Sequence, residues 1–471
     1  MTLNNSAPQS VSADFAANLD QTYQRLQAGL ISRARNYDWR LKQLQALKKL
    51  VEDNDTALSD AMWKDLRKSK FECLATEQGF VLSEINLTLK NLKNWMKSKR
   101  ASTPLYNQPG RSHITREPFG LTLIIGAWNY PINLLLAPLI GAIAGGNGAL
   151  LKPSELAVHT AALIAKLIPQ YLDSELFAVI QGAAAETNLI LDKKFDLIFF
   201  TGSSPVGKII LAKAAVHLTP TVLELGGKSP AIVWKDANLD VAARRIAWGK
   251  FLNAGQTCVA PDYVIIHPEV YKPFVEKLIL SLCDFYGQNP IQSPDYCRIV
   301  NTKNFDRLNK LLFELKVIHG GKIDREQLYV EPTLVEADEN SLIMQDEIFG
   351  PILPILKMDS LDAIAKFIKA RTKPLALYLF TKNNSVSDFI ITETSSGSVC
   401  VNDTVLQLSV SALPFGGVGS SGMGNYHGQF SFDTFTHAKS VLKKTFWFDA
   451  PFRYPPYSNL KAFWLKWFLN S

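Results

Sequence analysis

Short apolar segments alternate with helical patterns between residues 121 and 224. Each segment is too short for a buried helix and ends in small or polar residues; the segments are 121–125, 148–151, 177–180, 197–200 and 221–224. Short buried strands that alternate with helices are typical of a parallel, doubly wound sheet. Because ligands bind at the carboxyl ends of such strands, the residues after each segment are candidate site residues.

The flanking regions have different patterns. Apolar positions recur every three residues or so between 15 and 95, which predicts helices. Proline and glycine interrupt residues 100–119, and polar–apolar alternation follows, so an exposed hairpin or arm is expected there. A second series of apolar segments predicts another α/β unit, at 263–266, 329–334, 352–356, 375–380 and 398–401. The chain after Ser411 is rich in Gly, Phe and Pro and is expected to wrap or pair irregularly.

The 471 residues are 47% hydrophobic, which is enough for two to three domains. The net charge of +7 is scattered without a basic block, so nucleic acid is not a predicted partner. Five widely spaced cysteines favour reduced thiols in the cytoplasm over a disulfide framework. Residues 1–14 are polar, so no secretory signal is expected.

An apolar stretch at 462–469 is far shorter than the roughly 20 residues that a membrane span needs. It is rich in aromatic residues and carries nearby lysines: Phe463, Trp464, Trp467 and Phe468, with Lys461 and Lys466. Two interpretations stay open. The segment is a terminal helix docked on its own protein, or it lies flat on a membrane surface.

Cys258 lies among small residues and turn formers at 253–262. No histidine stands beside it, so a papain-like pair has no support, and no second cysteine lies at metal-ligand spacing, so no metal is predicted. A lone cysteine is most often an inert buried thiol. The Gly-Gln-Thr turn before Cys258 nevertheless favours a nucleophile, which needs exposure and nearby N–H donors.

Two polar side chains follow apolar segments upstream. Glu224 precedes two glycines that leave room for a ligand, although a solvated acid at a strand end is the plainer interpretation. Asn129, in the segment 126–131, is either a turn residue before Pro131 or an amide that donates to a developing oxyanion. A nucleophile, a base and a hydrogen-bond donor are what acyl transfer or carbonyl oxidation needs.

Two glycine-rich motifs match nucleotide-binding patterns in part. Residues 202–208 have the spacing of a phosphate-binding loop, but Ile209 replaces the hydroxyl residue that holds Mg²⁺, so an NTPase is not favoured. The same loop suits a pyrophosphate, since backbone N–H groups at a helix start attract anions. Residues 417–422 match a dinucleotide fingerprint by letters but lack the preceding buried strand, and a structural turn is expected there.

Eight motifs in order make the chain resemble the NAD(P)-dependent aldehyde dehydrogenase superfamily along nearly its full length. They lie at 117–120, 128–131, 152–155, 200–203, 224–228, 255–258, 347–351 and 414–417. The short N-terminus, the pair at 402–403 and the tail at 453–457 resemble the class 3 subgroup, which acts on fatty and aromatic aldehydes. Gln407 departs from that subgroup, which often carries histidine there, and leaves fine substrate preference open.

The resemblance implies roles for the three polar side chains. Cys258 is the implied nucleophile and forms a thiohemiacetal and then a thioester. The Asn129 amide and the Cys258 backbone N–H hold the oxyanion, and Glu224 activates the water that releases the acid. The implied fold is a doubly wound cofactor domain (1–99 and 120–225), an α/β catalytic domain (226–410), and a bridging or oligomerisation arm with a C-terminal tail (100–119 and 411–471).

The resemblance also implies an NAD site, with NADP as a second possibility. Its residues are Trp128, Lys152, Glu155, Gly202, Ser203, Gly207, Glu347 and Phe349. A carboxylate at Glu155 would bind ribose hydroxyls and repel a 2′-phosphate, whereas Lys152 favours that phosphate. The implied partners are an apolar aldehyde (long-chain, aromatic or isoprenoid-derived) and a second copy of the chain.

Two alternatives stay open. The chain could be a CoA-acylating reductase, in which a thiol replaces water, although Glu224 argues for water. It could instead be a membrane-associated binding protein that uses its aromatic tail.

Overall fold

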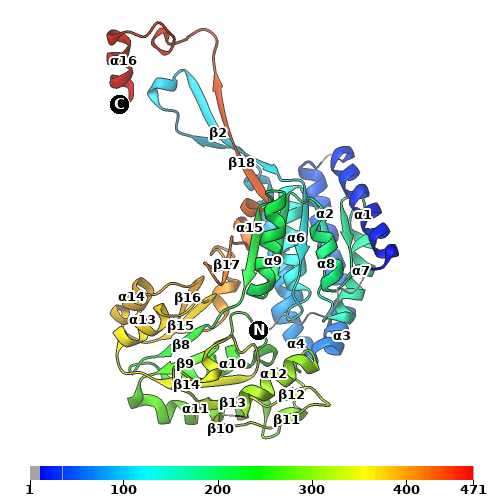
Figure 1. The fold of residues 1–471 in the computed structure, drawn as a ribbon, viewed down its shortest axis with the longest axis vertical. Helices are drawn as coiled ribbons and strands as arrows, with labels where there is room; N and C mark the ends of the chain where they lie inside the picture. The colour runs from blue at the N-terminus through cyan, green and yellow to red at the C-terminus, as the bar shows by residue number, and fades with distance from the viewer. Residues whose placement is uncertain (1–10, 34, 314, 470–471) are drawn as a thin grey trace.

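The computed structural model describes residues 11–33, 35–313 and 315–469. It contains two α/β units and a slender arm that projects from the body, with the C-terminus near its tip (Figure 1). Residues 1–10, where no secretory signal was expected, and the side chain of Phe468 lie outside the described residues.

The N-terminal region is helical, as predicted for residues 15–95. Its helices are α1 (Ala13–Ser32), α2 (Tyr37–Asp53), α3 (Asp55–Leu66), α4 (Lys70–Cys73) and α5 (Gly79–Trp95). Side-chain caps start two of them, because Ser12 accepts from the Phe15 N–H and Asn36 accepts from the Trp39 N–H. Three leucines at helical spacing in α2, Leu44, Leu47 and Leu50, are buried in the core that the first sheet's helices share.

The first sheet has the order β17-β7-β6-β3-β4-β5. Its strands are β3 (Leu121–Ile125), β4 (Gly148–Lys152), β5 (Phe177–Val179), β6 (Leu197–Gly202), β7 (Thr221–Leu225) and β17 (Gly422–Met423). The five strands between residues 121 and 225 run parallel, which confirms the prediction. They read as continuous apolar segments because helices cover both faces: α6 (Asn133–Gly145), α7 (Val158–Tyr171), α8 (Ala184–Leu191) and α9 (Ser204–Val216).

The second sheet has the order β10-β13-β14-β9-β8-β15-β16. Its strands are β8 (Pro230–Val233), β9 (Tyr263–Ile266), β10 (Lys316–His319), β13 (Thr333–Glu336), β14 (Ile352–Lys357), β15 (Ala376–Phe380) and β16 (Ser398–Val401). Helices α10 (Leu239–Phe251), α11 (Tyr271–Tyr286), α12 (Thr302–Leu312), α13 (Leu361–Lys369) and α14 (Asn384–Glu393) accompany it. The segment 329–334, expected as one strand, is two, because Pro332 separates β12 (Tyr329–Val330) from β13. Strand β8 was not predicted.

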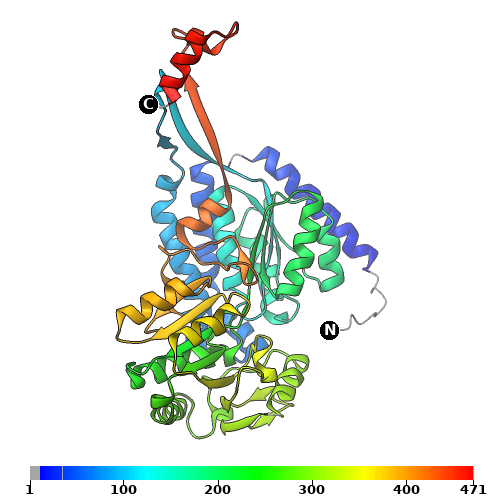
Figure 2. The ribbon, with the colours of Figure 1, turned by 60° about the vertical axis from the view of Figure 1, so that its left-hand side comes forward.

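The arm is an antiparallel sheet of β1 (Lys99–Ala101), β2 (Gly110–Pro118) and β18 (Thr436–Lys444), in the order β1-β2-β18. It agrees with the expected hairpin at 100–119, and β18 comes from the segment after Ser411, which also forms α15 (Gly428–Thr434). Figure 2 shows the arm leading away from the body to helix α16 (Asn459–Leu469). None of the described helices has the length and apolarity needed to cross a membrane.

Candidate active site

The turn before Cys258 has an unusual backbone. Asn253, Ala254 and Gly255 have φ angles of 52°, 50° and 73° in succession. Left-handed backbone costs about 1–2 kcal/mol for each non-glycine residue, so the surrounding structure must hold this turn. Glu72 accepts the Asn253 N–H at 2.9 Å, and the fully buried Gln256 side chain donates to the Arg298 carbonyl at 2.9 Å. The nucleophile segment is thus fixed from outside.

The Cys258 thiol carries its proton at rest. Burial raises its pKa to about 12, and the carboxyl groups of Glu347 and Glu224 add to the rise. The backbone N–H groups of Cys258 and Val259 oppose it by hydrogen bonding to the sulfur. These contributions show that both acids and two N–H donors lie around one sulfur atom. For this thiol to act as the implied nucleophile, a base would have to take its proton before or during attack.

Asn129 is buried beside the nucleophile segment. Its amide nitrogen donates one hydrogen to the Gln256 carbonyl at 3.0 Å. Its own backbone carbonyl accepts from Lys68 Nζ at 3.0 Å and from Asn253 Nδ2 at 2.9 Å. An amide NH₂ group has two hydrogens, so one remains for an oxygen in the site. This free hydrogen is what the implied role of Asn129 as an oxyanion donor requires.

Glu224 lies at the carboxyl end of β7, paired in register with Thr201 of β6 and Gly422 of β17. Its side chain is buried, and neither carboxyl oxygen has a hydrogen-bond partner among the described residues. Burial raises its pKa well above the ordinary value because a charge loses its hydration there. Such a carboxyl becomes a strong base once it loses its proton.

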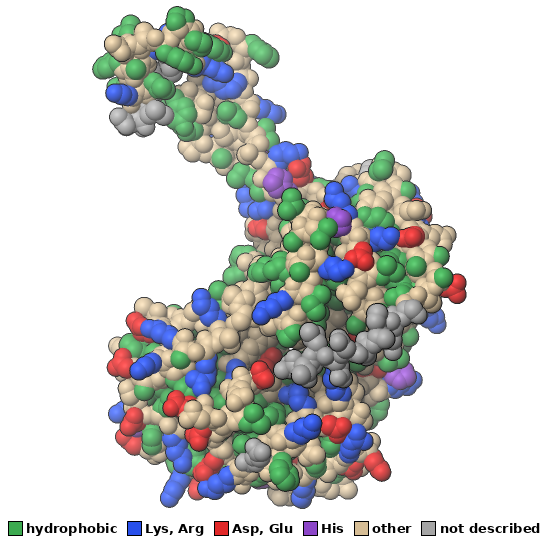
Figure 3. Space-filling view, in the orientation of Figure 1, with side chains coloured by type: hydrophobic (Ala, Val, Ile, Leu, Met, Phe, Trp, Pro, Cys, Tyr) green, Lys and Arg blue, Asp and Glu red, His purple; other side chains and the backbone are tan. Residues whose placement is uncertain are grey.

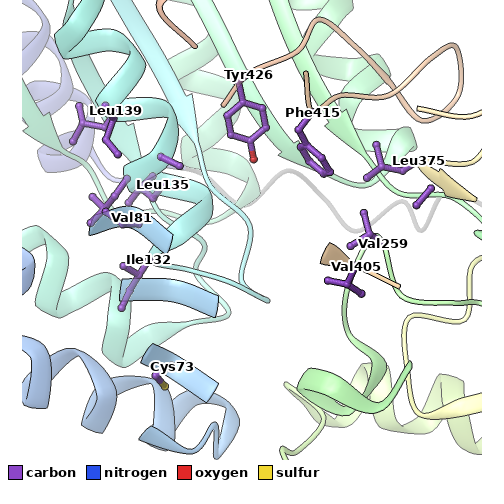
Figure 4. Close-up of a cluster of buried hydrophobic side chains, with 14 of the residues drawn as sticks. Cys73, Val81, Ile132, Leu135, Leu139, Val259, Leu375, Val405, Phe415 and Tyr426 are labelled. Carbon is purple, nitrogen blue, oxygen red and sulfur yellow. The ribbon is translucent and has the colours of Figure 1, made fainter. Parts of the chain in front are cut away.

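Cys258 packs against a buried cluster that contains aromatic rings. Phe415, Tyr426, Val259 and Val405 belong to one buried cluster (Figure 4). Burial raises the pKa of Tyr426 well above its ordinary value, and the charges of Glu224 and Cys258 add to the rise. His427 stacks on Phe415 with ring centroids 5.1 Å apart, and burial lowers its pKa to about 3, so it is neutral. Sequence reasoning missed Tyr426 and His427, for which no local pattern gives a signal.

The expected adenosine and pyrophosphate residues lie at the carboxyl edge of the first sheet. Lys152 ends β4, and its Nζ pairs with Glu155 at 2.6 Å. Gly202 ends β6 and Ser203 precedes α9, so the loop leads into a helix N-terminus that suits an anion. Gly207 lies inside α9, where a Cβ would come within 2.9 Å of Leu225. Its small size therefore serves close packing of helix against strand.

Three further residues of the implied NAD site, Trp128, Glu347 and Phe349, lie on two loops, and Gly226 approaches one of them. A Cβ at Gly226 would lie 2.1 Å from Glu347 Oε2, so only glycine leaves room for that carboxyl. Burial raises the pKa of Glu347 to about 8, with Asp262 adding to the rise. Trp128 and Phe349 meet edge to face at 5.4 Å. A helix start, a glycine gap and buried acids fit the dinucleotide that the resemblance implies.

Proteins of one known family resemble this chain in sequence and in fold. The family model described as "Aldehyde dehydrogenase family" matches residues 8–441. The mouse protein "Aldehyde dehydrogenase, dimeric NADP-preferring" is 49% identical over 90% of this chain and 94% of its own length. The "4,4'-diaponeurosporen-aldehyde dehydrogenase" of Staphylococcus aureus is 47% identical over 91% and 95%. The solved structure "Substrate bound state of Staphylococcus Aureus AldH" superposes with a TM-score of 0.94 at 45% identity, covering 96% of this chain and 99% of that one.

Proposed function

The chain belongs to the aldehyde dehydrogenase family, and on that premise we propose that it oxidises an apolar aldehyde to the carboxylic acid. The family uses NAD(P)⁺ as oxidant. Family membership makes the chain an oxidoreductase, which sets aside the non-enzymatic alternative as its main function. The observation that carries the proposal is a buried Cys258 thiol whose pKa the Glu224 carboxyl helps to raise, on a segment that the Asn129 amide binds through the Gln256 carbonyl.

Attack begins at the sulfur. Cys258 Sγ bonds to the aldehyde carbon as its proton leaves for a nearby base, and the carbonyl oxygen gains negative charge. The Asn129 amide and the Cys258 N–H donate hydrogen bonds to that oxygen. Losing one such donor raises the barrier by about 3–4 kcal/mol. A dinucleotide held by the residues of the implied cofactor site would supply the hydride acceptor, and oxidation of the thiohemiacetal would leave a thioester on Cys258.

Hydrolysis then falls to Glu224. Its carboxylate takes a proton from water, the resulting hydroxide attacks the thioester, and the carboxylic acid leaves as Cys258 Sγ regains a proton. The raised pKa of Glu224 suits this step, because a base works best with a pKa near the working pH. A buried acid without a partner favours water over CoA as the acyl acceptor. Added CoA should therefore yield no acyl-CoA, and an acyl-CoA product would make the chain a CoA-acylating reductase instead.

The substrate class follows from the walls of the site. Two aromatic rings and a neutral histidine offer apolar contact with little charge. The S. aureus relative is named for 4,4'-diaponeurosporen-aldehyde. We propose a long-chain, aromatic or isoprenoid-derived aldehyde as the substrate.

A panel of aldehydes tests both activity and substrate class. NAD(P)H formation is followed with aldehydes of increasing chain length. Each buried methylene contributes about 0.8 kcal/mol, so kcat/KM should rise roughly fourfold per carbon until the pocket is full. A flat series with clear turnover would remove the substrate class and leave the reaction. No turnover with any aldehyde would remove the reaction itself.

Cofactor preference gives a further prediction. Glu155 is held by Lys152 and is 42% exposed, so its negative charge would face a bound ribose. Glu155→Gln should raise the ratio of kcat/KM with NADP⁺ to that with NAD⁺ by about tenfold, because it removes repulsion of the 2′-phosphate. Glu186→Gln is the control. Glu186 lies in α8, and its carboxylate accepts the backbone N–H of Ala183 at the start of that helix. An unchanged ratio would mean that Glu155 does not face the ribose.

The domain assignment and the assembly are part of the same proposal. Residues 1–99 and 120–225 would bind the cofactor, residues 226–410 would carry the nucleophile, and residues 100–119 and 411–471 would serve assembly. Strand β16 is the edge of the second sheet and so has backbone groups free to pair. The mouse relative is named as dimeric. We infer a cytoplasmic homodimer, and sedimentation at micromolar concentration would reveal a monomer if this is wrong.

Peripheral membrane contact is proposed from the charge of the arm, defined as residues 97–118 and 436–469. It carries eleven Lys or Arg and two Asp or Glu, a net charge of +9, whereas the whole chain carries +7. Aromatic and aliphatic side chains are exposed at its tip, among them Trp447, Phe463 and Trp464. Figure 3 shows hydrophobic and basic side chains mixed on this projection. A basic, aromatic surface suits an anionic bilayer.

Vesicle flotation tests the membrane contact. The wild type should float with anionic vesicles, and Lys443→Glu/Lys444→Glu should lower the partition coefficient at least about tenfold, since each nearby cation contributes about 1 kcal/mol. A matched charge change on the body, Lys366→Glu/Lys369→Glu, should leave it unchanged. Truncation before Pro455 separates the tail from the strands. Equal flotation of all variants, or none, would remove the membrane and leave the second copy as the arm's partner.

A further inference from the structure

A buried ion pair, distant in sequence from Cys258, contacts the segment that carries Asn129. Lys68 lies in the loop between α3 and α4, and Glu77 lies in the helical turn before α5. The side chains of Lys68 and Glu77 are fully buried, and Lys68 Nζ donates to Glu77 Oε1 at 2.8 Å. Neither residue faces the sulfur, and the proposed reaction does not use them. A buried ion pair adds little stability over apolar side chains of the same size, so a pair at this place needs another reason.

The pair binds the backbone of the segment that carries Asn129. Lys68 Nζ also donates to the Asn129 carbonyl at 3.0 Å and lies 4.0 Å from the centre of the Tyr130 ring. Glu77 Oε2 accepts the backbone N–H groups of Ile132 and Asn133 at 3.1 and 2.9 Å, at the start of α6. The ion pair therefore holds both the carbonyl of Asn129 and the helix start that follows it.

The same group of residues reaches the nucleophile segment. Asn253 Nδ2 donates to the Asn129 carbonyl, and its backbone N–H donates to Glu72. Burial lowers the pKa of Lys68, but the carboxylates of Glu77 and Glu72 outweigh burial, so the pKa is raised and the lysine stays charged. The Asn129 carbonyl oxygen thus accepts two hydrogen bonds. One comes from Lys68 in the loop between α3 and α4, and the other comes from Asn253 in the turn before Cys258.

We propose that Lys68 and Glu77 are positioning residues, which fix the Asn129 backbone so that its amide and the Cys258 N–H point at one oxyanion. This inference rests on the proposed function. A hydrogen-bond donor loses most of its effect when it is displaced by about 1 Å, because it then no longer meets the charge that develops. Lys68 acts through Asn129 and not on the substrate.

The test is a double-mutant cycle. Lys68→Met alone leaves Glu77 as an unpaired buried charge, which is strongly destabilising. Lys68→Met/Glu77→Gln removes both charges, and the Gln oxygen still accepts the N–H groups at the start of α6. This pair of changes should lower kcat for aldehyde oxidation roughly 30- to 100-fold and leave the dissociation constant for NAD(P)⁺ unchanged. In an Asn129→Ala background the same changes should cost less than about threefold, because there is no amide left to position.

Arg40→Met is the matched control. Arg40 is a buried cation that donates to the Ala144 carbonyl at 2.8 Å, near the other end of α6. It should lower the unfolding midpoint without lowering kcat. An activated aryl ester, which acylates the Cys258 thiol without a cofactor, gives a second measure of oxyanion stabilisation in every variant.

Three results would overturn the inference. They are an unchanged kcat in the double variant, the same fold loss in the Asn129→Ala background, or an equal loss in Arg40→Met. If the wild type oxidises no aldehyde, the proposed function fails first, and the ester assay still shows whether Lys68 acts through Asn129.

Discussion

Replacing Cys258 with alanine is expected to lower kcat/KM for aldehyde oxidation by about 10⁵-fold or more. The sulfur forms the bond to the substrate carbon, and nothing else in the site replaces it. Asn129 and Glu224 act only on groups that this bond creates, so their contributions disappear with it. NAD(P)H formation with the best aldehyde of the panel measures the effect.

The fold should survive this change. Cys258 precedes a buried valine and makes no side-chain hydrogen bond to another residue's side chain among the described contacts, so the unfolding midpoint and NAD(P)⁺ binding should stay near those of the wild type. Cys283→Ala is the control, since that partly exposed thiol lies on α11, on the second sheet. Retained activity in Cys258→Ala would refute the assignment of the nucleophile.

Glu224→Gln is expected to lower steady-state turnover about 10²- to 10³-fold while a first burst of NAD(P)H remains. Gln has the same shape but cannot take a proton, so the thioester forms and then waits for water. The burst amplitude counts the enzyme molecules that reached the thioester. Stopped-flow absorbance at the NAD(P)H band separates the two phases.

A second buried glutamate provides a control for Glu224→Gln. Glu331 is another buried glutamate, in the loop before β13, and accepts the Lys322 N–H at 2.9 Å, so Glu331→Gln should change neither phase. Equal loss of burst and turnover in Glu224→Gln would give Glu224 a role before the thioester. That result would leave hydrolysis without an assigned base.

The pH profile follows from the direction of the Glu224 shift. Burial raises the pKa of its carboxyl, so the acid form, which cannot accept a proton, persists to higher pH than for an exposed glutamate. Turnover of the wild type should therefore rise with pH as the carboxylate forms. In Glu224→Gln this rise should disappear from the steady state.

Much of the first sheet was predictable because its strands are buried on both faces. Such strands appear as unbroken apolar segments, and Leu121–Ile125 and Leu197–Gly202 show this pattern. Strand β17 and the pairing of β18 with β2 were not predicted, since each depends on partners hundreds of residues away. Strand β8 was not predicted, because its four residues directly follow a glycine, a lysine and a serine, which are typical of a loop.

Some residues of the candidate site could be predicted from the sequence, and others could not. Cys258, Glu224 and Asn129 were found from their local settings and from the order of the motifs, and the structure brings them together; their catalytic roles remain predictions. No sequence pattern pointed to Tyr426 and His427, because aromatic residues in a glycine-rich loop do not recur at a helical or strand spacing. Lys68 and Glu77 were not singled out in the sequence, and their burial as an ion pair distinguishes them only in the folded chain.

The sequence by itself determined the family, the alternating strands and helices of the first sheet, and which thiol, acid and amide to consider. These follow from local pattern, since periodicity and motif order are written along the chain. Tertiary structure alone decided that Glu224 has no hydrogen-bond partner among the described residues, that Cys258 packs against an aromatic cluster, and that Lys68 donates to the carbonyl of Asn129. Burial and contact between distant segments exist only once the chain has folded, and they set the pKa values and the geometry on which the chemistry depends.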